Sequence, residues 1–175
     1  MRKIGQIFRF LIPVIALVAL VVFMTGAGRR ERARLEKNKA IIVRYEDAVW
    51  RKLNWDVADE IVASDHVRHR IGGPGDIQGF EALKQFATEV FTAIPDFDWT
   101  TEFMIAEGDK VVSFGTCTGT HTGTAWDIPA SGNEVNFMGI YIHRIADGKI
   151  VETWALDDNL AVTLQMGFKL VPPGE

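Results

Sequence analysis

The stretch GIYIHRIADGKIVETWALDD, residues 139–158, carries the clearest structural signal in the chain. An Asp-Gly pair, Asp147-Gly148, separates two apolar runs, Ile140–Ile145 and Ile150–Leu156. An Asp-Gly pair between two alternating runs is typical of a β-hairpin closed by a two-residue turn. The stretch therefore predicts two neighbouring antiparallel strands.

A two-residue turn determines which residues face each other across this hairpin. Counting outward from the turn pairs His143 with Glu152 and Tyr141 with Trp154, and it brings several aromatic and titratable side chains to one face because side chains alternate along a strand. These side chains are Phe137, Tyr141, His143, Trp154 and Asp158. Aromatic rings mixed with titratable groups are typical of a ligand cavity rather than of a plain core. The count therefore predicts that Asp158 points into a pocket.

The chain changes character near Asp98. Before it, the helical spacing of apolar residues predicts helices over Asn38–Leu53, Asp56–Val62 and Gly79–Ile94. A short strand is expected over Asp65–Arg70. Alternating runs predict the later strands, and these runs are Trp99–Ala106, Val111–Thr120, Val135–Ala146 and Ile150–Asp157. Three helices followed by antiparallel strands predict an α+β fold, with the helices packed on one face of a curved antiparallel sheet.

The composition excludes several classes of function. A net charge of −4 over 175 residues, without a sustained basic stripe in the globular part, argues against nucleic acid as a partner. The single cysteine, Cys117, excludes an internal disulfide and a Cys-rich zinc site. His66 and His69 fall on opposite faces of a strand, and no His-Glu-x-x-His motif is present. We therefore expect no metal.

The N-terminal segment is strongly apolar. Phe10–Met24 is an unbroken apolar run that extends to Gly28, and a cluster of Arg and Lys residues follows it. This pattern predicts a transmembrane helix that anchors the protein, and the basic cluster places the following domain on the cytoplasmic side. A cleaved signal peptide is the alternative, with Thr25-Gly26-Ala27 as a cleavage site.

Several motifs resemble those of the SnoaL-like polyketide cyclase, or ester cyclase, family. They are Gly119–Gly123, Ile128-Pro129, Arg144–Trp154, Asp158 with Leu160, Ala82–Phe86 and Ala106–Val112. The resemblance spans about residues 37–167 and implies a cone-shaped, nuclear-transport-factor-like fold. We expect residues 1–36 to form the anchor and its connector, residues 37–168 the SnoaL-like domain and residues 169–175 a tail.

The resemblance also implies a function. Characterised members close a ring of a polyketide ester by an intramolecular aldol step without a metal or organic cofactor, and their acid/base is an aspartate that Asp158 matches best. Asp157 stands beside it, so the assignment could move by one residue. Asp127–Asn133 departs from the family's Gly-Ile-Pro-Pro-Thr-Gly-Lys pattern, which leaves the substrate open. We further expect a homodimer.

The candidate site follows from these points. We expect Asp158 to act as general base and then acid, because a carboxyl group in an apolar pocket suits proton abstraction beside a carbonyl. His143 would polarise the carbonyl. Substrate binding is expected from His69, His121, Phe137, Tyr141 and Trp154. The alternatives are that Asp158 only caps a final helix over residues 158–166, that His143 is an exposed strand residue and that His121 belongs to a turn. His66 is expected at the surface.

Three functions remain open at this point. The first is a cofactor-free cyclase, lyase or isomerase that acts on a small hydrophobic carbonyl substrate. The second is a non-catalytic ligand-binding or dimerisation module tethered to the membrane. The third is an epoxide hydrolase, which requires paired carboxylates. Asp157 and Asp158 should point to opposite faces, which makes the third the weakest.

Overall fold

The computed structural model describes the backbone of residues 2–171 and the side chains of residues 26–171. The chain divides into two units, Met1–Lys37 and Asn38–Glu175. Helix α1 is assigned over Arg2–Trp50, and its residues from Asn38 onward belong to the second unit.

The expected transmembrane helix requires a correction. Within the residues that the structure describes, none of the helices has an apolar stretch long enough to span a membrane. The described side chains of α1 begin at Gly26 and soon become charged, with Arg29, Arg30, Glu31 and Arg32 in succession. This finding overturns the expected anchor, and with it the single-pass location and the cytoplasmic orientation. Residues 10–25 of the expected span lie outside the residues whose side chains are described.

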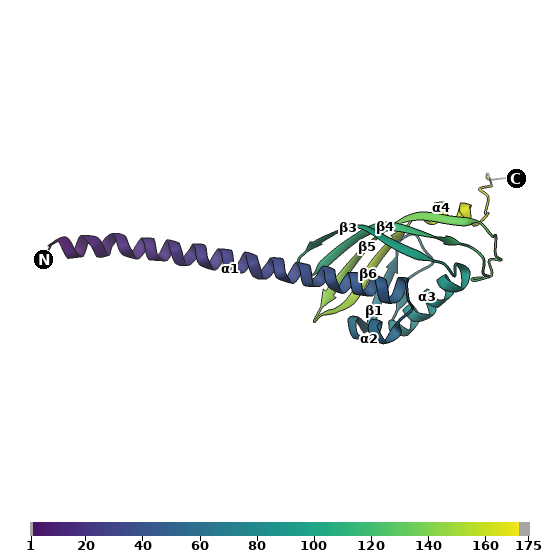
Figure 1. The fold of residues 1–175 in the computed structure, drawn as a ribbon, viewed down its shortest axis with the longest axis horizontal. Coiled ribbons are helices and arrows are strands. Elements are labelled where there is room, and N and C mark those ends of the chain that lie inside the picture. Colours follow the sequence, from purple (N-terminus) through teal and green to yellow (C-terminus); the bar gives the residue numbers. More distant parts are fainter. Residues whose placement is uncertain (1, 172–175) are drawn as a thin grey trace. The chain divides into compact units, whose positions relative to one another are not determined.

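The second unit is built around a six-stranded sheet. The chain forms α2 (Trp55–Ile61), β1 (Val62–Arg70), β2 (Ile77–Gln78), α3 (Phe80–Ala93), β3 (Asp98–Glu107), β4 (Lys110–Thr120), β5 (Glu134–Ala146), β6 (Lys149–Asp157) and α4 (Asn159–Gln165). The strand order is β2-β1-β6-β5-β4-β3 (Figure 1). The predicted α+β class is confirmed. The sheet is not wholly antiparallel, because β1 pairs with β6 in parallel.

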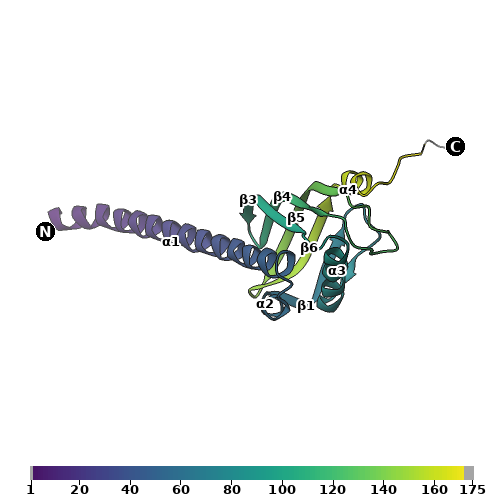
Figure 2. The same ribbon diagram turned by 45° about the vertical axis from the view of Figure 1, so that its right-hand side comes forward.

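Helices cover one face of this sheet. The C-terminal turns of α1, together with α2 and α3, lie against the inner face, as Figures 1 and 2 show. In α3 the buried Phe80, Leu83 and Ala87 recur at helical spacing. They pack with Ile42 and Val49 of α1 in the main core. The helices and the sheet thus enclose the main apolar core.

The hairpin forms at the predicted turn. Ala146 pairs with Lys149 and Ile145 with Ile150. Asp147 and Gly148 take φ values of 50° and 78°, and positive φ at both central residues is what a type I′ turn requires.

Beyond the turn the predicted register is wrong. A β-bulge lies next to the Arg144/Ile145 position, so that Arg144 pairs with Glu152, His143 with Thr153 and Tyr141 with Ala155. One extra residue on β6 reverses the alternation of every residue that follows it. Trp154 is therefore displaced from the inner face.

Strand β1 shows the same kind of correction. Its pairing with β6 is irregular between Val62 and Val67, and His66 is buried with 0% exposure. His66 was expected at the surface, and that prediction is wrong. Arg68 is also buried, whereas His69 pairs with Trp154.

Candidate functional site

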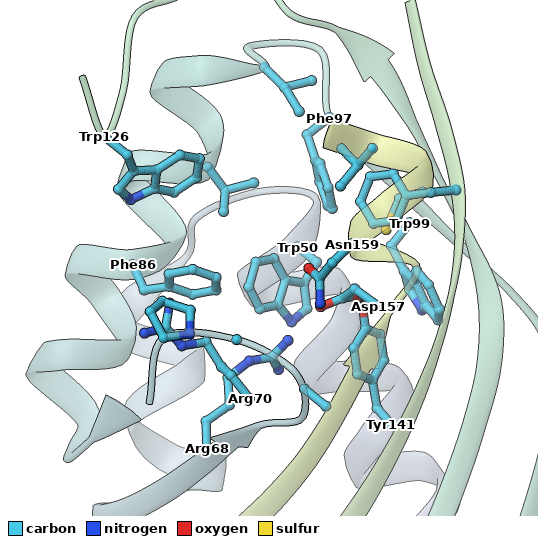
Figure 3. Close-up of a pocket in the computed structure, with 18 of the residues that line it drawn as sticks. Trp50, Arg68, Arg70, Phe86, Phe97, Trp99, Trp126, Tyr141, Asp157 and Asn159 are labelled. Atoms are coloured by element: carbon cyan, nitrogen blue, oxygen red, sulfur yellow. Dashed lines mark hydrogen bonds between the residues drawn. The ribbon is translucent and has the colours of Figure 1, made fainter. Parts of the chain in front are cut away.

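A cavity of about 440 Å³ opens between the helices and the inner face of the sheet (Figure 3). Most of its lining is aromatic or aliphatic, and the largest rings are Trp50, Phe86, Phe97, Trp99, Trp126, Phe137 and Tyr141. The charged residues of the lining are Arg68, Arg70 and Asp157. An apolar hollow with a few polar groups is the usual form of a small-molecule site.

Tyr141 and Asp157 form a polar pair in this wall. The Tyr141 hydroxyl donates a hydrogen bond to Asp157 Oδ1. Burial, followed by the charge of Asp157, raises the pKa of Tyr141 well above its usual value. The phenol therefore keeps its proton and remains a donor that holds the carboxylate in place.

Gly139 makes room for this pair. It lies opposite Asp157 in the hairpin. A Cβ atom at this position would come within 2.8 Å of Tyr141 Oη and 3.1 Å of Asp157 Oδ1. A side chain on residue 139 would therefore push the pair apart.

Trp99 supports Tyr141 from the side. The two rings lie 4.9 Å apart. Trp99 Nε1 donates to Thr101 Oγ1 at 2.9 Å, and Thr101 Oγ1 donates to Glu46 Oε2 at 2.6 Å. Burial raises the pKa of Glu46, although the hydrogen bonds that Glu46 accepts lower it. This chain of hydrogen bonds orients the indole that packs on Tyr141.

Arg68 is a buried cation in the cavity wall. Its guanidinium carbon lies 5.2 Å from the Trp50 ring, 5.8 Å from Phe86 and 5.1 Å from Tyr141. Burial by itself lowers the pKa of Arg68. The neighbouring Tyr45, Tyr141 and Asp157 have the opposite and larger effect, so the pKa of Arg68 is raised overall. Arg68 therefore remains a cation, and its Nε has no hydrogen-bond partner within the described residues.

Two histidines are buried together next to the cavity. His66 Nε2 and His143 Nδ1 lie 3.0 Å and 3.1 Å from Thr153 Oγ1. Burial, with the charge of Arg68, lowers the pKa of His66 to about 4 and that of His143 to about 3. Both rings are therefore neutral near pH 7. His143 packs edge-on against Tyr45, with ring centroids 5.6 Å apart.

The structure brings two of the seven predicted site residues to the cavity. Phe137 and Tyr141 line it. His143 lies on the inner face but is fully buried and does not line the cavity. His121 is buried elsewhere, with Nδ1 at 3.1 Å from Ser131 Oγ.

The other three predicted residues point elsewhere. His69 lies between Asp76 (2.8 Å) and Glu152 (2.9 Å). It stacks on Trp154 with ring centroids 5.4 Å apart. Asp158 is the N-cap of α4, and its Oδ1 accepts a hydrogen bond of 2.9 Å from Ala161 N. The bulge in β6 is the physical reason, because it turns Asp157 rather than Asp158 toward Tyr141.

Sequence analysis missed the two arginines of the cavity. Both belong to the run Asp65–Arg70, in which strict alternation puts His66, Arg68 and Arg70 on one face. This alternation could be read from the sequence, but the face with Val67 and His69 was expected to point inward. In the part of the chain that the structure describes, no group of three or more His, Cys, Asp or Glu side chains is placed to hold a metal ion.

A family model described as SnoaL-like polyketide cyclase matches residues 40–166. No curated protein matches the chain. A candidate SnoaL-like polyketide cyclase from Jannaschia sp. CCS1 is 25% identical, with a TM-score of 0.71 over 77% of this chain and 94% of that one. A candidate polyketide cyclase from Bacillus cereus is 28% identical, with a TM-score of 0.64 over 75% of this chain and 80% of that one. A SnoaL-like polyketide cyclase from Agrobacterium tumefaciens, at 20% identity and a TM-score of 0.60 over 74% of this chain and 98% of that one, shares the fold.

Proposed function

The chain belongs to the SnoaL-like polyketide cyclase family, and we propose that it is a cofactor-independent cyclase or isomerase that acts on a small hydrophobic carbonyl compound. The family supports a cyclase or isomerase role in general. The observation that carries the finer proposal is the Tyr141–Asp157 hydrogen bond in the wall of an aromatic cavity.

Asp157 is the proposed general base. With Oδ1 held by Tyr141, Asp157 takes a proton from the carbon next to the substrate carbonyl. The electron pair of the broken C–H bond moves into an enolate, whose oxygen faces the Arg68 cation. In a cyclase the enolate carbon then attacks a second carbonyl of the same molecule, and Asp157 returns the proton to the new alkoxide. No proton is gained or lost over the cycle.

The Asp157/Asp158 neighbours provide a matched test of this role. We expect Asp157→Asn to lower turnover by about 100-fold or more, which is the usual contribution of a positioned general base. Asp158→Asn should stay within about twofold of wild type, since Asn caps a helix as well as Asp. The measurement is proton–deuterium exchange at the carbon beside the carbonyl of 1-tetralone and 2-tetralone, followed by NMR.

Two outcomes would contradict the proposal. If Asp158→Asn lost the exchange and Asp157→Asn kept it, the base would be the helix cap. If wild-type protein bound these ketones without accelerating exchange, the alternative of a non-catalytic ligand-binding module would be favoured. Circular dichroism of each variant controls for loss of fold.

The same proposal includes a homodimer. A row of apolar side chains crosses four strands, because Phe103 pairs with Phe114, Phe114 with Ile140, and Ile140 with Leu156. Phe103, Ile140 and Leu156 are exposed. A continuous exposed apolar patch is typical of a protein–protein interface, and a second copy of this chain is the partner that we propose.

A further inference from the structure

The charges of the cavity lining do not balance. Two of the charged lining residues, Arg68 and Arg70, are cations and one, Asp157, is an anion. The rest of the lining is uncharged and mostly apolar. The cavity lining therefore carries a net charge of about +1, and the buried Arg68 lies where water screens charge weakly.

Arg68 contributes most to this imbalance. It is 3% exposed. None of the ion pairs found in the described part of the chain includes it. Its Nε is buried without a partner. Aromatic rings stabilise a buried cation only in part, and a buried charge normally has an ionic partner.

Arg70 brings a second guanidinium to the same place. Arg70 Cζ lies 5.4 Å from the Phe86 ring and Arg68 Cζ lies 5.8 Å from the same ring. Arg70 Nε donates to the Gly75 carbonyl at 2.8 Å, which fixes the side chain. Figure 3 shows Arg70 near Phe86, Asp157 next to Tyr141 and Arg68 in the wall between these two pairs. Two cations that contact one ring repel each other, and an anion bound between them would offset that repulsion.

We propose that Arg68 and Arg70 form an anion clamp, and that the ligand of this cavity is a flat, apolar monoanion that carries a carboxylate. This inference rests on the proposed function for the identity of the ligand as the substrate. Guanidinium groups bind carboxylates through two parallel hydrogen bonds. A carboxylate held by the clamp would bring the substrate charge to −1 and the liganded cavity to zero.

The charge balance also favours a monoanion over a phosphate group. A dianion would leave the liganded cavity with a net charge of −1. With a monoanion the total stays at zero through the proposed proton transfer, because the charge that leaves Asp157 appears on the enolate. The aromatic lining suits a flat apolar body, which can pack against the faces and edges of these rings.

The test compares two ligands of the same shape and different charge. Naphthalene-2-carboxylate and naphthalene-2-carboxamide are titrated into the full-length protein at pH 7.5, and binding is followed by the fluorescence of the cavity residues Trp50, Trp99 and Trp126. A charge-assisted hydrogen-bond pair corresponds to a preference for the carboxylate of about tenfold or more. A dianionic probe, 2-naphthyl phosphate, should bind more weakly than the carboxylate.

Variants connect this preference to the clamp. Arg68→Met should abolish it, and Arg70→Gln should reduce it. Arg44→Met is the matched control, because Arg44 pairs with Glu60 on an exposed surface and is not part of the cavity lining. The melting temperature of each variant is measured without ligand. If Arg68→Met does not fold, Arg70→Gln decides the result alone.

The outcomes separate this inference from the proposed reaction. Asp157→Asn should bind the carboxylate as tightly as wild type or more tightly, since it removes a negative charge from the cavity. If the wild type accelerates ketone exchange, Asp157→Asn loses it and neither protein prefers the carboxylate, the clamp is refuted and the proposed reaction is not. Equal binding of acid and amide, no binding of either, or a preference that survives both Arg68→Met and Arg70→Gln would overturn the inference.

Discussion

At the scale of single residues, the candidate chemistry depends on a hydrogen bond and on the space around it. Tyr141 donates to Asp157, and Gly139 leaves room for both side chains. Asp158 directly follows Asp157 but accepts a hydrogen bond from the backbone of α4. Two adjacent aspartates thus have different surroundings, because successive side chains at the end of a strand point in different directions.

Gly139→Ala tests how tightly this pair is confined. The added methyl group would lie 2.8 Å from Tyr141 Oη, so we expect the pair to move and the ketone exchange to fall about tenfold or more, with a loss of about 1–3 kcal/mol in unfolding free energy. Exchange rates and urea denaturation measure the two effects. Gly28→Ala is the control, since no atom lies within 4 Å of a Cβ there. If Gly139→Ala exchanged the ketone proton as fast as the wild type, the Tyr141–Asp157 pair would not be tightly confined.

At the scale of elements, the bulge in β6 decides which face each side chain occupies. Before the bulge Ile150 faces Ile145 as predicted, and after it Ala155 faces Tyr141. Side chains alternate between the two faces of a sheet. A shift of one residue therefore moves each following side chain from the cavity wall to the outer surface, or the reverse. The outer surface consequently gains Trp154, which stacks on His69.

The exposed apolar row on the outer face of the sheet leads to a prediction about dimerisation. Ile140→Lys should convert a dimer into a monomer, because it puts a charge in the middle of the row from Phe103 to Leu156. Size-exclusion chromatography with light scattering gives the mass. Val43→Lys is the control, since Val43 is also exposed but lies on α1. A wild-type monomer, or a dimer that persists in Ile140→Lys, would contradict the proposed interface.

At the scale of the whole molecule, the fold buries two imidazoles that must stay neutral. His66 and His143 share the Thr153 hydroxyl inside the sheet. Their pKa values of about 4 and about 3 lie below the ordinary value of 6.5. The unfolded chain therefore binds protons at a higher pH than the folded protein, so this part of the stability is complete above about pH 6.5 and is lost as the pH falls.

We expect an acid-sensitive fold as a result. Between pH 7 and pH 4 the unfolding free energy should drop by roughly 3 kcal/mol through His66 alone, with a further loss through His143. Urea denaturation at pH 7.5, 5.5 and 4.5 measures this. His143→Leu should flatten the pH dependence.

His69→Gln is the matched control for this experiment. The hydrogen bond with Glu152, followed by that with Asp76, raises the pKa of His69 although partial desolvation lowers it. His69 therefore stabilises the fold at low pH, and its loss should not reduce the acid sensitivity. If His143→Leu kept the full pH slope, His143 would not contribute to the acid sensitivity.

Much of the fold follows from patterns that lie close together in the sequence. The Asp147-Gly148 turn, the apolar stripe of α3 and the alternating strands each predict an element from its own residues, and the family motifs predict the same α+β fold. The candidate site follows less well. Phe137 and Tyr141 could be predicted because β5 runs without a register shift against β4.

The sequence by itself determined the fold class, the hairpin turn and the family of this protein, since each depends on short-range periodicity or on local motifs. Only the tertiary structure decided that Asp157 joins Tyr141 in the cavity and that Arg68 lies buried beside them. The physical reason is that a bulge forms where packing on both faces of a strand favours one extra residue. That balance depends on contacts between segments far apart in the chain, such as Arg68 with Thr153.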